Sequence, residues 1–389
     1  MYQVRTYNQI SSKGLDRFNR ENYQVADELD RPDALLLRSQ KLHEVELPDS
    51  VVAVARAGAG VNNIPVSEYT KKGIVVFNTP GANANAVKEL VTAALLLGSR
   101  DIFGGMNYVQ SLTPISDAGD MSRLLEKEKK RFAGSEIYGK TLGVVGLGAI
   151  GAIVANMALD LGMDVIGYDP AISVEAAWRL SSRVEKMDSL QSLLARADFV
   201  TLHVPVVPAT RHLIDAEALG KLKAGAKLLN FAREEIVDSE ALINALDKGQ
   251  LGGYIADFPT PELLGRDNVL LMPHIGASTA EAEENCAVMA ANQLKDFLES
   301  GNIENSVNFP TTTMARVGGH RLTFSNNNVP KVLGNVLSIL ADSNNNVIDL
   351  VNKSRDSIAY NIIDLEDKPS AAIVSAIAAV EGVMRVRLL

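Results

Sequence analysis

Three ionisable side chains in the second half of the chain are placed to carry out acid–base chemistry on a carboxylic acid. Arg233, Glu262 and His274 each follow an apolar run that predicts a strand, and α/β sheets bind ligands at the carboxyl ends of their strands. A guanidinium matches a carboxylate through two parallel N–H groups. An imidazole titrates near neutral pH and can accept the proton of an alcohol while hydride leaves its carbon. A carboxylate beside that imidazole would fix its tautomer.

Each of these residues also has a structural interpretation when it is taken alone. His274 could cap a helix, Arg233 could form a surface ion pair with Glu234 or Glu235, and Glu262 alone indicates nothing. Their shared position at successive strand ends favours a joint role. We therefore expect the guanidinium to bind a substrate carboxylate, the imidazole to act as general acid and base, and the carboxylate to orient it.

A glycine pattern upstream of these residues predicts a dinucleotide site. The apolar run Leu142–Val145 predicts a buried strand, and Gly146, Gly148 and Gly151 follow it into a helix. Two of these glycines let the backbone turn and approach a pyrophosphate at the helix N-terminus, and the third lets helix and strand pack closely. Asp169 closes the next strand, where a Rossmann fold binds a ribose hydroxyl, which favours NAD over NADP. The alternative is a glycine-rich turn in an α/β domain without a ligand.

The elements that must position these residues are predicted to form two α/β domains. Apolar runs alternate with helical patterns over about the first 300 residues, which is typical of βαβ units around parallel sheets. The glycine pattern occurs only in the second sheet, so we expect the first sheet to belong to the substrate-binding domain. We expect a cleft between the two domains. We predict a discontinuous substrate-binding domain of residues 1–98 and 281–308, and an NAD-binding Rossmann domain of residues 99–280.

The last part of the chain, residues 318–389, predicts a separate domain with the β-α-β-β-α-β order of the ferredoxin-like fold. A polar segment that contains proline, Asn302–Thr313, is the expected linker to it. The predicted strands and helices are Arg321–Phe324, Pro330–Ala341, Val347–Asn352, Ile358–Asp364, Pro369–Ala379 and Val383–Leu388.

Composition excludes several classes of protein. The chain has 389 residues, 47% hydrophobic and 22% charged, as in ordinary globular proteins of two or three domains. No apolar run approaches the ~18 residues of a membrane span, and the first residues do not resemble a secretory signal. The net charge of −9 argues against nucleic-acid binding. A single cysteine, Cys286, fits a reducing cytoplasm. No cluster of Cys and His has zinc spacing, so we expect no metal.

A series of motifs in order along the chain resembles the D-2-hydroxyacid dehydrogenases. They are Arg56–Ile64, Asn78–Gly81, Gly139–Leu142, Gly167–Pro170, His203–Pro205, Asn230–Arg233 and Pro273–Thr279. The family has an Arg/Glu/His catalytic set, which Arg233, Glu262 and His274 match. The resemblance is to the group that oxidises D-3-phosphoglycerate to 3-phosphohydroxypyruvate with NAD, the first step of phosphorylated L-serine biosynthesis. Alternatives are a glyoxylate or hydroxypyruvate reductase and, from another class, a nucleotide-sensing corepressor-like regulator.

The resemblance also implies which residues contact the cofactor and the substrate. The implied cofactor contacts are Thr79, Gly146, Gly148, Ala149, Ile150, Gly151, Asp169, His203, Val204, Pro205, Thr210, Phe231, Ala232, Arg233, Asp257, His274 and Gly276. The implied substrate contacts are Arg56, Ala57, Gly58, Arg233 and His274.

The substrate phosphate needs further positive charge. Candidates are Arg56 and the cluster Lys129, Lys130 and Arg131, and the resemblance suggests that this cluster reaches a neighbouring subunit's cleft in a homodimer or homotetramer. The alternative is a solvated helical face.

Two features depart from the family pattern. Glu234 stands where the family has glycine after the arginine, and it would be strained there if that position has a positive φ. The segment between Glu262 and His274 is shorter than in many relatives.

The C-terminal block resembles an ACT domain, a small module that senses ligands. The matching segments are Asn328–Gly334 and Gly382–Leu388. Relatives inhibited by L-serine have a His and an Asn before the proline and a second Asn in the next turn. Asn328 and Asn346 match the asparagines, but Asn326 replaces the histidine, which removes one donor for a serine effector. The alternative is a module that serves only oligomerisation.

Overall fold

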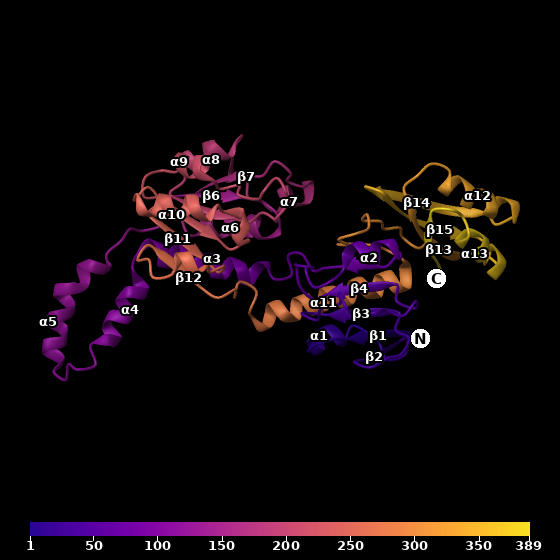
Figure 1. The fold of residues 1–389 in the computed structure, drawn as a ribbon, viewed down its shortest axis with the longest axis horizontal. Coiled ribbons are helices and arrows are strands. Elements are labelled where there is room, and N and C mark those ends of the chain that lie inside the picture. Colours follow the sequence, from indigo (N-terminus) through magenta and orange to yellow (C-terminus); the bar gives the residue numbers. More distant parts are fainter. The chain divides into compact units, whose positions relative to one another are not determined.

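The computed structural model describes residues 1–389, apart from the side chain of Glu175. The chain forms two compact units, Met1–Asn83 with Ala280–Leu389, and Ala84–Thr279 (Figure 1). This division differs from the predicted domains in two places. Helix α3 (Ala84–Ser99) belongs to the second unit because its apolar face packs against α6 (Ala149–Asp160). The C-terminal block belongs to the first unit because its sheet packs against that unit's core.

The first unit contains a parallel sheet of five strands in the order β2-β1-β3-β4-β5. Its strands are β1 (Tyr2–Thr6), β2 (Tyr23–Ala26), β3 (Ala34–Leu37), β4 (Ala53–Arg56) and β5 (Val75–Phe77), with α1 (Ser12–Leu15) and α2 (Val66–Lys71) between them. Helix α11 (Ala280–Ser300) covers one face, where Leu294 and Phe297 share a core with Val4 and Phe77. Neither α11 nor any other described helix is both long and apolar enough to cross a membrane.

The second unit contains a parallel sheet of seven strands in the order β12-β11-β10-β9-β6-β7-β8. Its strands are β6 (Thr141–Val145), β7 (Asp164–Tyr168), β8 (Glu185–Lys186), β9 (Phe199–Leu202), β10 (Lys227–Asn230), β11 (Gly253–Ala256) and β12 (Val269–Leu271). Neighbouring residues such as Leu228 and Leu229 contribute to the cores on opposite faces. The predicted Rossmann-like parallel sheet is therefore confirmed. Its strand order reverses between β6 and β9, which is where such sheets bind ligands.

Helices cover both faces of this sheet, and a pair of helices projects from the second unit (Figure 1). The projecting pair is α4 (Ile102–Ser111) and α5 (Ala118–Glu128), which bury none of their residues. Besides these two helices, α3 and α6, the second unit contains η1 (Lys129–Phe132), α7 (Val174–Arg179), α8 (Leu190–Arg196), α9 (Ala216–Lys221), η2 (Glu234–Ile236), α10 (Ser239–Asp247) and η3 (Pro261–Leu263).

The C-terminal block forms an antiparallel sheet in the order β14-β15-β13-β16 with two helices. Its elements are β13 (His320–Asn327), α12 (Val332–Asp342), β14 (Val347–Arg355), β15 (Ile358–Leu365), α13 (Ala371–Ala378) and β16 (Val383–Leu388). This is the predicted β-α-β-β-α-β order. Strand β15 is buried throughout because the helices cover one face of the sheet and the first unit's core covers the other.

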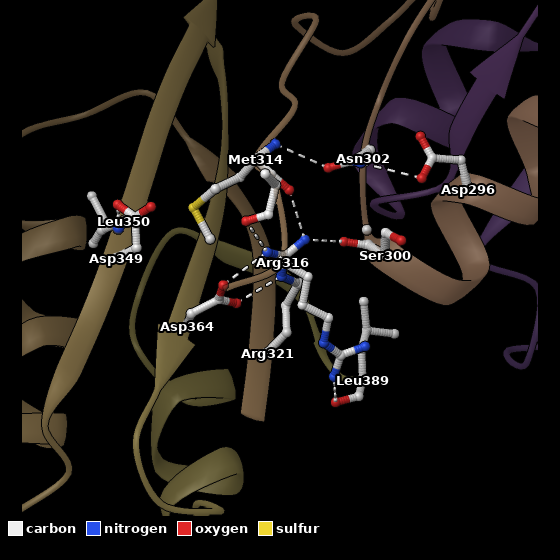
Figure 2. A network of polar contacts seen from close by, with 12 residues as sticks. Asp296, Ser300, Asn302, Met314, Arg316, Arg321, Asp349, Leu350, Asp364 and Leu389 are labelled. Atoms are coloured by element: carbon white, nitrogen blue, oxygen red, sulfur yellow. Dashed lines mark hydrogen bonds and ion pairs between the residues drawn. The ribbon is translucent and has the colours of Figure 1, made fainter. Parts of the chain in front are cut away.

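The expected linker is not an exposed tether. Ile303 pairs with Thr312, and Phe309 lies in the core that also contains Phe297 and Tyr360. Arginines of the C-terminal sheet also bind carbonyls near the end of α11. The fully buried Arg321 forms a bidentate ion pair with Asp364 and donates to the carbonyls of Ser300, Met314 and Ala315 (Figure 2). Prolines and polar residues suggested a linker, but packing fixes this segment.

Candidate active site

The three glycines after β6 differ in backbone conformation and in what surrounds them. Gly146 has a φ of +89°, and a Cβ there would lie 2.6 Å from the carbonyl oxygen of His203. A Cβ on Gly151 would overlap the carbonyl oxygen of Gly146, so the helix can approach the strand only with glycine. Gly148 is the N-cap of α6, and a Cβ there would meet nothing within 4 Å. The backbone thus leaves open space at the N-terminus of α6, where N–H groups attract anions.

Asp169 lies against this glycine loop. One carboxylate oxygen accepts a 2.8 Å hydrogen bond from the Leu147 N–H, and the other accepts a 2.9 Å bond from the Ala171 N–H. Each carboxylate oxygen has two lone pairs, so each can accept a further hydrogen bond. The carboxylate is therefore oriented by backbone groups and can still bind a hydroxyl.

The loop after β9 lies on the other side of the point where the strand order reverses. The His203 N–H donates to the carbonyl of Val145, and its Nε2 lies 2.9 Å from the Thr201 hydroxyl. Burial lowers the pKa of His203 to about 3, so its imidazole is neutral at physiological pH. Its Nδ1 is excluded from solvent and has no hydrogen-bond partner among the described residues. Thr210, another implied cofactor contact, folds this loop by donating to the Pro205 carbonyl at 2.6 Å.

Arg233 follows β10, and a buried asparagine holds its loop. The Asn230 amide accepts from the Ala232 N–H at 3.1 Å and donates to the Arg233 carbonyl at 2.8 Å. The same amide donates to the Tyr254 hydroxyl at 3.2 Å. Sequence reasoning missed this role of Asn230. A polar residue at the end of an otherwise apolar strand was the available signal.

Phe258, which sequence reasoning also missed, joins two of the predicted residues. The guanidinium carbon of Arg233 lies 5.5 Å from the centre of its ring. The His274 imidazole lies 4.6 Å from the same ring, centre to centre. The structure therefore brings Arg233 and His274 together at the ends of β10, β11 and β12, on one aromatic side chain.

Asp257 supplies a buried carboxylate next to this cluster. Its Oδ2 accepts a 3.0 Å bond from the Gly276 N–H, while its Oδ1 is buried without a partner among the described residues. Burial raises the pKa of Asp257, and the Gly276 N–H, His274 and Arg233 act in the opposite direction. A buried acceptor without a donor is costly, so this oxygen has spare capacity for a ligand's N–H or O–H group.

Glu262 is not in contact with His274 here. It lies in η3 and is exposed, and among the described residues its carboxylate makes no hydrogen bond or ion pair. The expected strain at Glu234 is also absent from the described backbone, because Glu234 begins the 3₁₀ helix η2 without a positive φ. Glutamate therefore adopts this backbone conformation without the expected strain.

The implied substrate contacts Arg56, Ala57 and Gly58 follow β4 in the first unit. The Arg56 guanidinium donates to the carbonyl of Arg38 at 2.9 Å and to that of Gly60. The Gly58 carbonyl accepts from the N–H of Thr79, another implied cofactor contact, whose side chain is fully buried. These bonds link the segments that follow β3, β4 and β5.

The cationic cluster and the three asparagines are largely engaged in local contacts. Lys129 pairs with Glu126, and Arg131 pairs with Glu128 at 3.0 Å. The Asn326 side chain accepts from Asn361 at 2.8 Å and donates to the Asn327 carbonyl at 2.7 Å. Asn328 follows the end of β13 where Asn327 pairs with Ile358, whereas Asn346 precedes Val347, which pairs with Leu365 at the opposite end. One module does not bring Asn328 and Asn346 together.

Comparison with known proteins gives the family. The profile described as "D-isomer specific 2-hydroxyacid dehydrogenase, NAD binding domain" matches residues 107–276. The D-3-phosphoglycerate dehydrogenase of Haemophilus influenzae is 32% identical over 357 residues, which cover 89% of this chain and 83% of that protein. The chain belongs to the D-2-hydroxyacid dehydrogenase family. The family match confirms the predicted dinucleotide-binding domain.

Two further members of this family show the extent of the similarity. The D-3-phosphoglycerate dehydrogenase of Synechocystis is 39% identical over 299 residues, which are 75% of this chain but 51% of that protein. This chain thus spans about half the length of that relative. The solved NAD⁺-bound 3-phosphoglycerate dehydrogenase of Entamoeba histolytica has a TM-score of 0.59 at 25% identity, covering 79% of this chain and 98% of that structure.

Proposed function

We propose that this D-2-hydroxyacid dehydrogenase oxidises D-3-phosphoglycerate to 3-phosphohydroxypyruvate with NAD, at the start of phosphorylated L-serine biosynthesis. The observation that carries the proposal is that Arg233 and His274 pack on one side chain, Phe258. A 2-hydroxy acid needs a carboxylate-binding group and an acid–base group at adjacent carbons, and this cluster offers both. The names of the Synechocystis and Haemophilus relatives support the choice of substrate.

The residues around the glycine loop fit NAD. The open space at Gly148 suits a pyrophosphate at the N-terminus of α6. The carboxylate of Asp169 suits ribose hydroxyls and would repel the 2′-phosphate of NADP. The buried Oδ1 of Asp257 suits an amide donor such as the carboxamide of nicotinamide. When bound, NAD accepts the hydride that leaves C2 of the substrate.

The protein side chains supply binding and proton transfer. We propose that Arg233 holds the substrate carboxylate and polarises the oxygen on C2. The His274 imidazole accepts the proton of the C2 hydroxyl as the carbon–hydrogen bond breaks, so that a carbonyl forms. Hydrogen bonds of such groups often tighten only when substrate is bound, and on that ground we retain Glu262 as the partner of His274.

A homo-oligomer would bring further groups to the site. Helix α4 exposes Phe103 and Met106 by 57% and 63%, respectively. A groove of about 600 Å³ beside them is lined by apolar side chains that include Val109 and Phe132. Exposed apolar surface of this kind marks protein interfaces. We therefore propose that α4 and α5 dimerise, and that Lys130 and its neighbours bind the substrate phosphate of the partner subunit.

We further propose that the C-terminal block is an ACT-like module. Its β-α-β-β-α-β order supports this. Regulation by L-serine would require two paired modules, because Asn328 and Asn346 lie at opposite ends of one sheet. Asn326 already uses its amide oxygen on Asn361 and one of its two N–H groups on the Asn327 carbonyl, so we expect weak inhibition by serine at most.

The experiment that tests the proposed function compares kcat/KM across 2-hydroxy acids and 2-oxo acids. The panel is D-3-phosphoglycerate, D-glycerate and D-lactate with NAD, and glyoxylate and hydroxypyruvate with NADH. We expect the phosphorylated acid to be preferred by about tenfold or more. Preference for glyoxylate or hydroxypyruvate would assign the chain to the small-acid reductases. Binding of NADH without turnover of any acid would indicate a nucleotide-sensing regulator.

A further inference from the structure

A second pocket lies in the first unit and contains none of the proposed active-site residues. It has a volume of about 630 Å³, within the range of ~300–1,000 Å³ of small-molecule sites. One wall is a single face of α11, and the other wall is formed by Gly81, Ala82, Asn302, Glu304 and Asn305. Side chains at intervals of three and four residues, from Asn285 to Asp296, face the same space.

Gln293 is the feature of this pocket that packing does not explain. Its side chain lines the pocket and is 8% exposed. Neither its Oε1 nor its Nε2 has a hydrogen-bond partner among the described residues. A buried amide that lacks both a donor and an acceptor is costly to the fold. A ligand that donates to Oε1 and accepts from Nε2 would remove that cost.

The charges around Gln293 select the sign of the ligand. The lining includes two carboxylates, Asp296 and Glu304, and no lysine, arginine or histidine among the described residues that form it. A carboxylate or phosphate ligand would be repelled, whereas an ammonium group would be attracted. Val288 and Met289 add an apolar surface to the same wall, which suits a short hydrocarbon chain.

The rim of the pocket is held in place by the polar network described above. The Asn302 side chain donates to Asp296 Oδ1 at 3.2 Å and accepts from the Met314 N–H at 3.1 Å (Figure 2). Arg321 binds the Met314 carbonyl in the same network. The Asp296 carboxylate is therefore oriented before any ligand arrives, which lowers the entropy cost of binding.

We propose that this pocket, lined by Gln293, Asp296 and Glu304, binds a small organic ammonium ion that also carries a hydrogen-bond acceptor. The ammonium group lies at the carboxylates and donates to Oε1 of Gln293, whose amide is buried in this conformation and turns toward the pocket when the ligand binds. A hydroxyl or carbonyl oxygen of the ligand accepts from the Gln293 Nε2. A short apolar chain between these groups contacts Val288 and Met289.

The test uses three matched probes in isothermal titration of the full chain. 4-Aminobutan-1-ol carries the ammonium, the chain and the acceptor, butylamine lacks the acceptor, and butane-1,4-diol lacks the charge. We expect the amino alcohol to bind about tenfold more tightly than butylamine, and more tightly still than the diol. Equal affinities for all three probes, or no binding of the amino alcohol, would overturn the proposal.

Variants locate the binding site. Gln293→Met has a similar volume and no amide, so it should bind the amino alcohol and butylamine equally. Asp296→Asn keeps an oxygen for Asn302 while it removes the charge, and with Glu304→Gln it should abolish ammonium binding. Glu217→Gln, an exposed change on α9 in the second unit, is the control and should bind as the wild type does. Unchanged affinity in the pocket variants would place binding elsewhere and refute the assignment.

Discussion

Substituting the buried Gly151 of α6 by alanine should destabilise the second unit. The added methyl would overlap the Gly146 carbonyl oxygen, and its next neighbours include the Gly146 carbonyl carbon at 2.9 Å. These are backbone atoms, so α6 must move away from β6. Overpacking of this kind costs about 1–3 kcal/mol. For a unit of this size that corresponds to a fall in Tm of about 2–12 °C.

Gly148→Ala is the matched control because it adds the same methyl three residues earlier. Its φ is −68° and its Cβ would meet nothing within 4 Å. The lower capping propensity of alanine and the loss of glycine's freedom in the unfolded chain each amount to less than about 1 kcal/mol and offset one another. The methyl would, however, fill the space proposed for the pyrophosphate. We expect an unchanged Tm and an NADH affinity lower by about tenfold or more.

The assay is thermal unfolding without cofactor together with titration of NADH fluorescence for both variants. The structure predicts that the two variants change different properties. Gly151→Ala lowers Tm, whereas Gly148→Ala lowers the affinity for NADH at a normal Tm. A Gly151→Ala protein that melts like the wild type would refute the packing argument. A Gly148→Ala protein that binds NADH normally would show that the cofactor does not pass this glycine.

Three further variants test other parts of the structure. The buried His203 has its pKa lowered to about 3, so the unfolded chain takes up a proton that the native state does not as pH falls below about 6.5. Stability should therefore fall by about 1.4 kcal/mol per pH unit from this residue, and His203→Gln should remove that part of the slope in urea titrations between pH 6 and about 4. Asp364→Asn breaks the buried pair with Arg321 and should cost about 3–5 kcal/mol in chemical denaturation, whereas a change below about 1 kcal/mol would show that the carbonyl acceptors suffice. Arg233→Lys keeps the charge but loses the bidentate geometry, so KM for the hydroxy acid should rise by about tenfold or more. An unchanged KM would show that a group other than Arg233 binds the substrate carboxylate.

Much of the fold was predictable because its central strands are buried on both faces. Strands β3 and β9 are buried at every position and read in the sequence as apolar runs that only Thr201 interrupts. Strand β1 does not stand out in the sequence because it is a mixed run in which only Val4 is buried, and β2 is an edge strand in which only Tyr23 is buried and Gln24 is exposed. Runs of hydrophobic residues therefore identified the interior of each sheet but not its periphery.

The site was predictable to the extent that backbone geometry dictates residue type. Gly146 and Gly151 are required by a positive φ and by close packing, and such demands leave a fixed spacing in the sequence. The roles of Asn230 and Phe258 depend on contacts between different strand-end loops, and no local pattern encodes those. The same holds for Arg321, whose five N–H groups meet acceptors from four separate residues.

The most direct test of the proposed function is the rate of NADH formation from D-3-phosphoglycerate and NAD by the wild type and by His274→Ala. The imidazole of His274 is proposed to accept the substrate proton, and loss of such a group lowers kcat by about 10²–10⁴. NADH should still bind the variant, because the glycine loop and Asp169 are unchanged. Turnover by the wild type with a loss of this size in the variant is the result we predict. A wild type that forms no NADH from this acid, or a variant with near-normal kcat, would contradict the account.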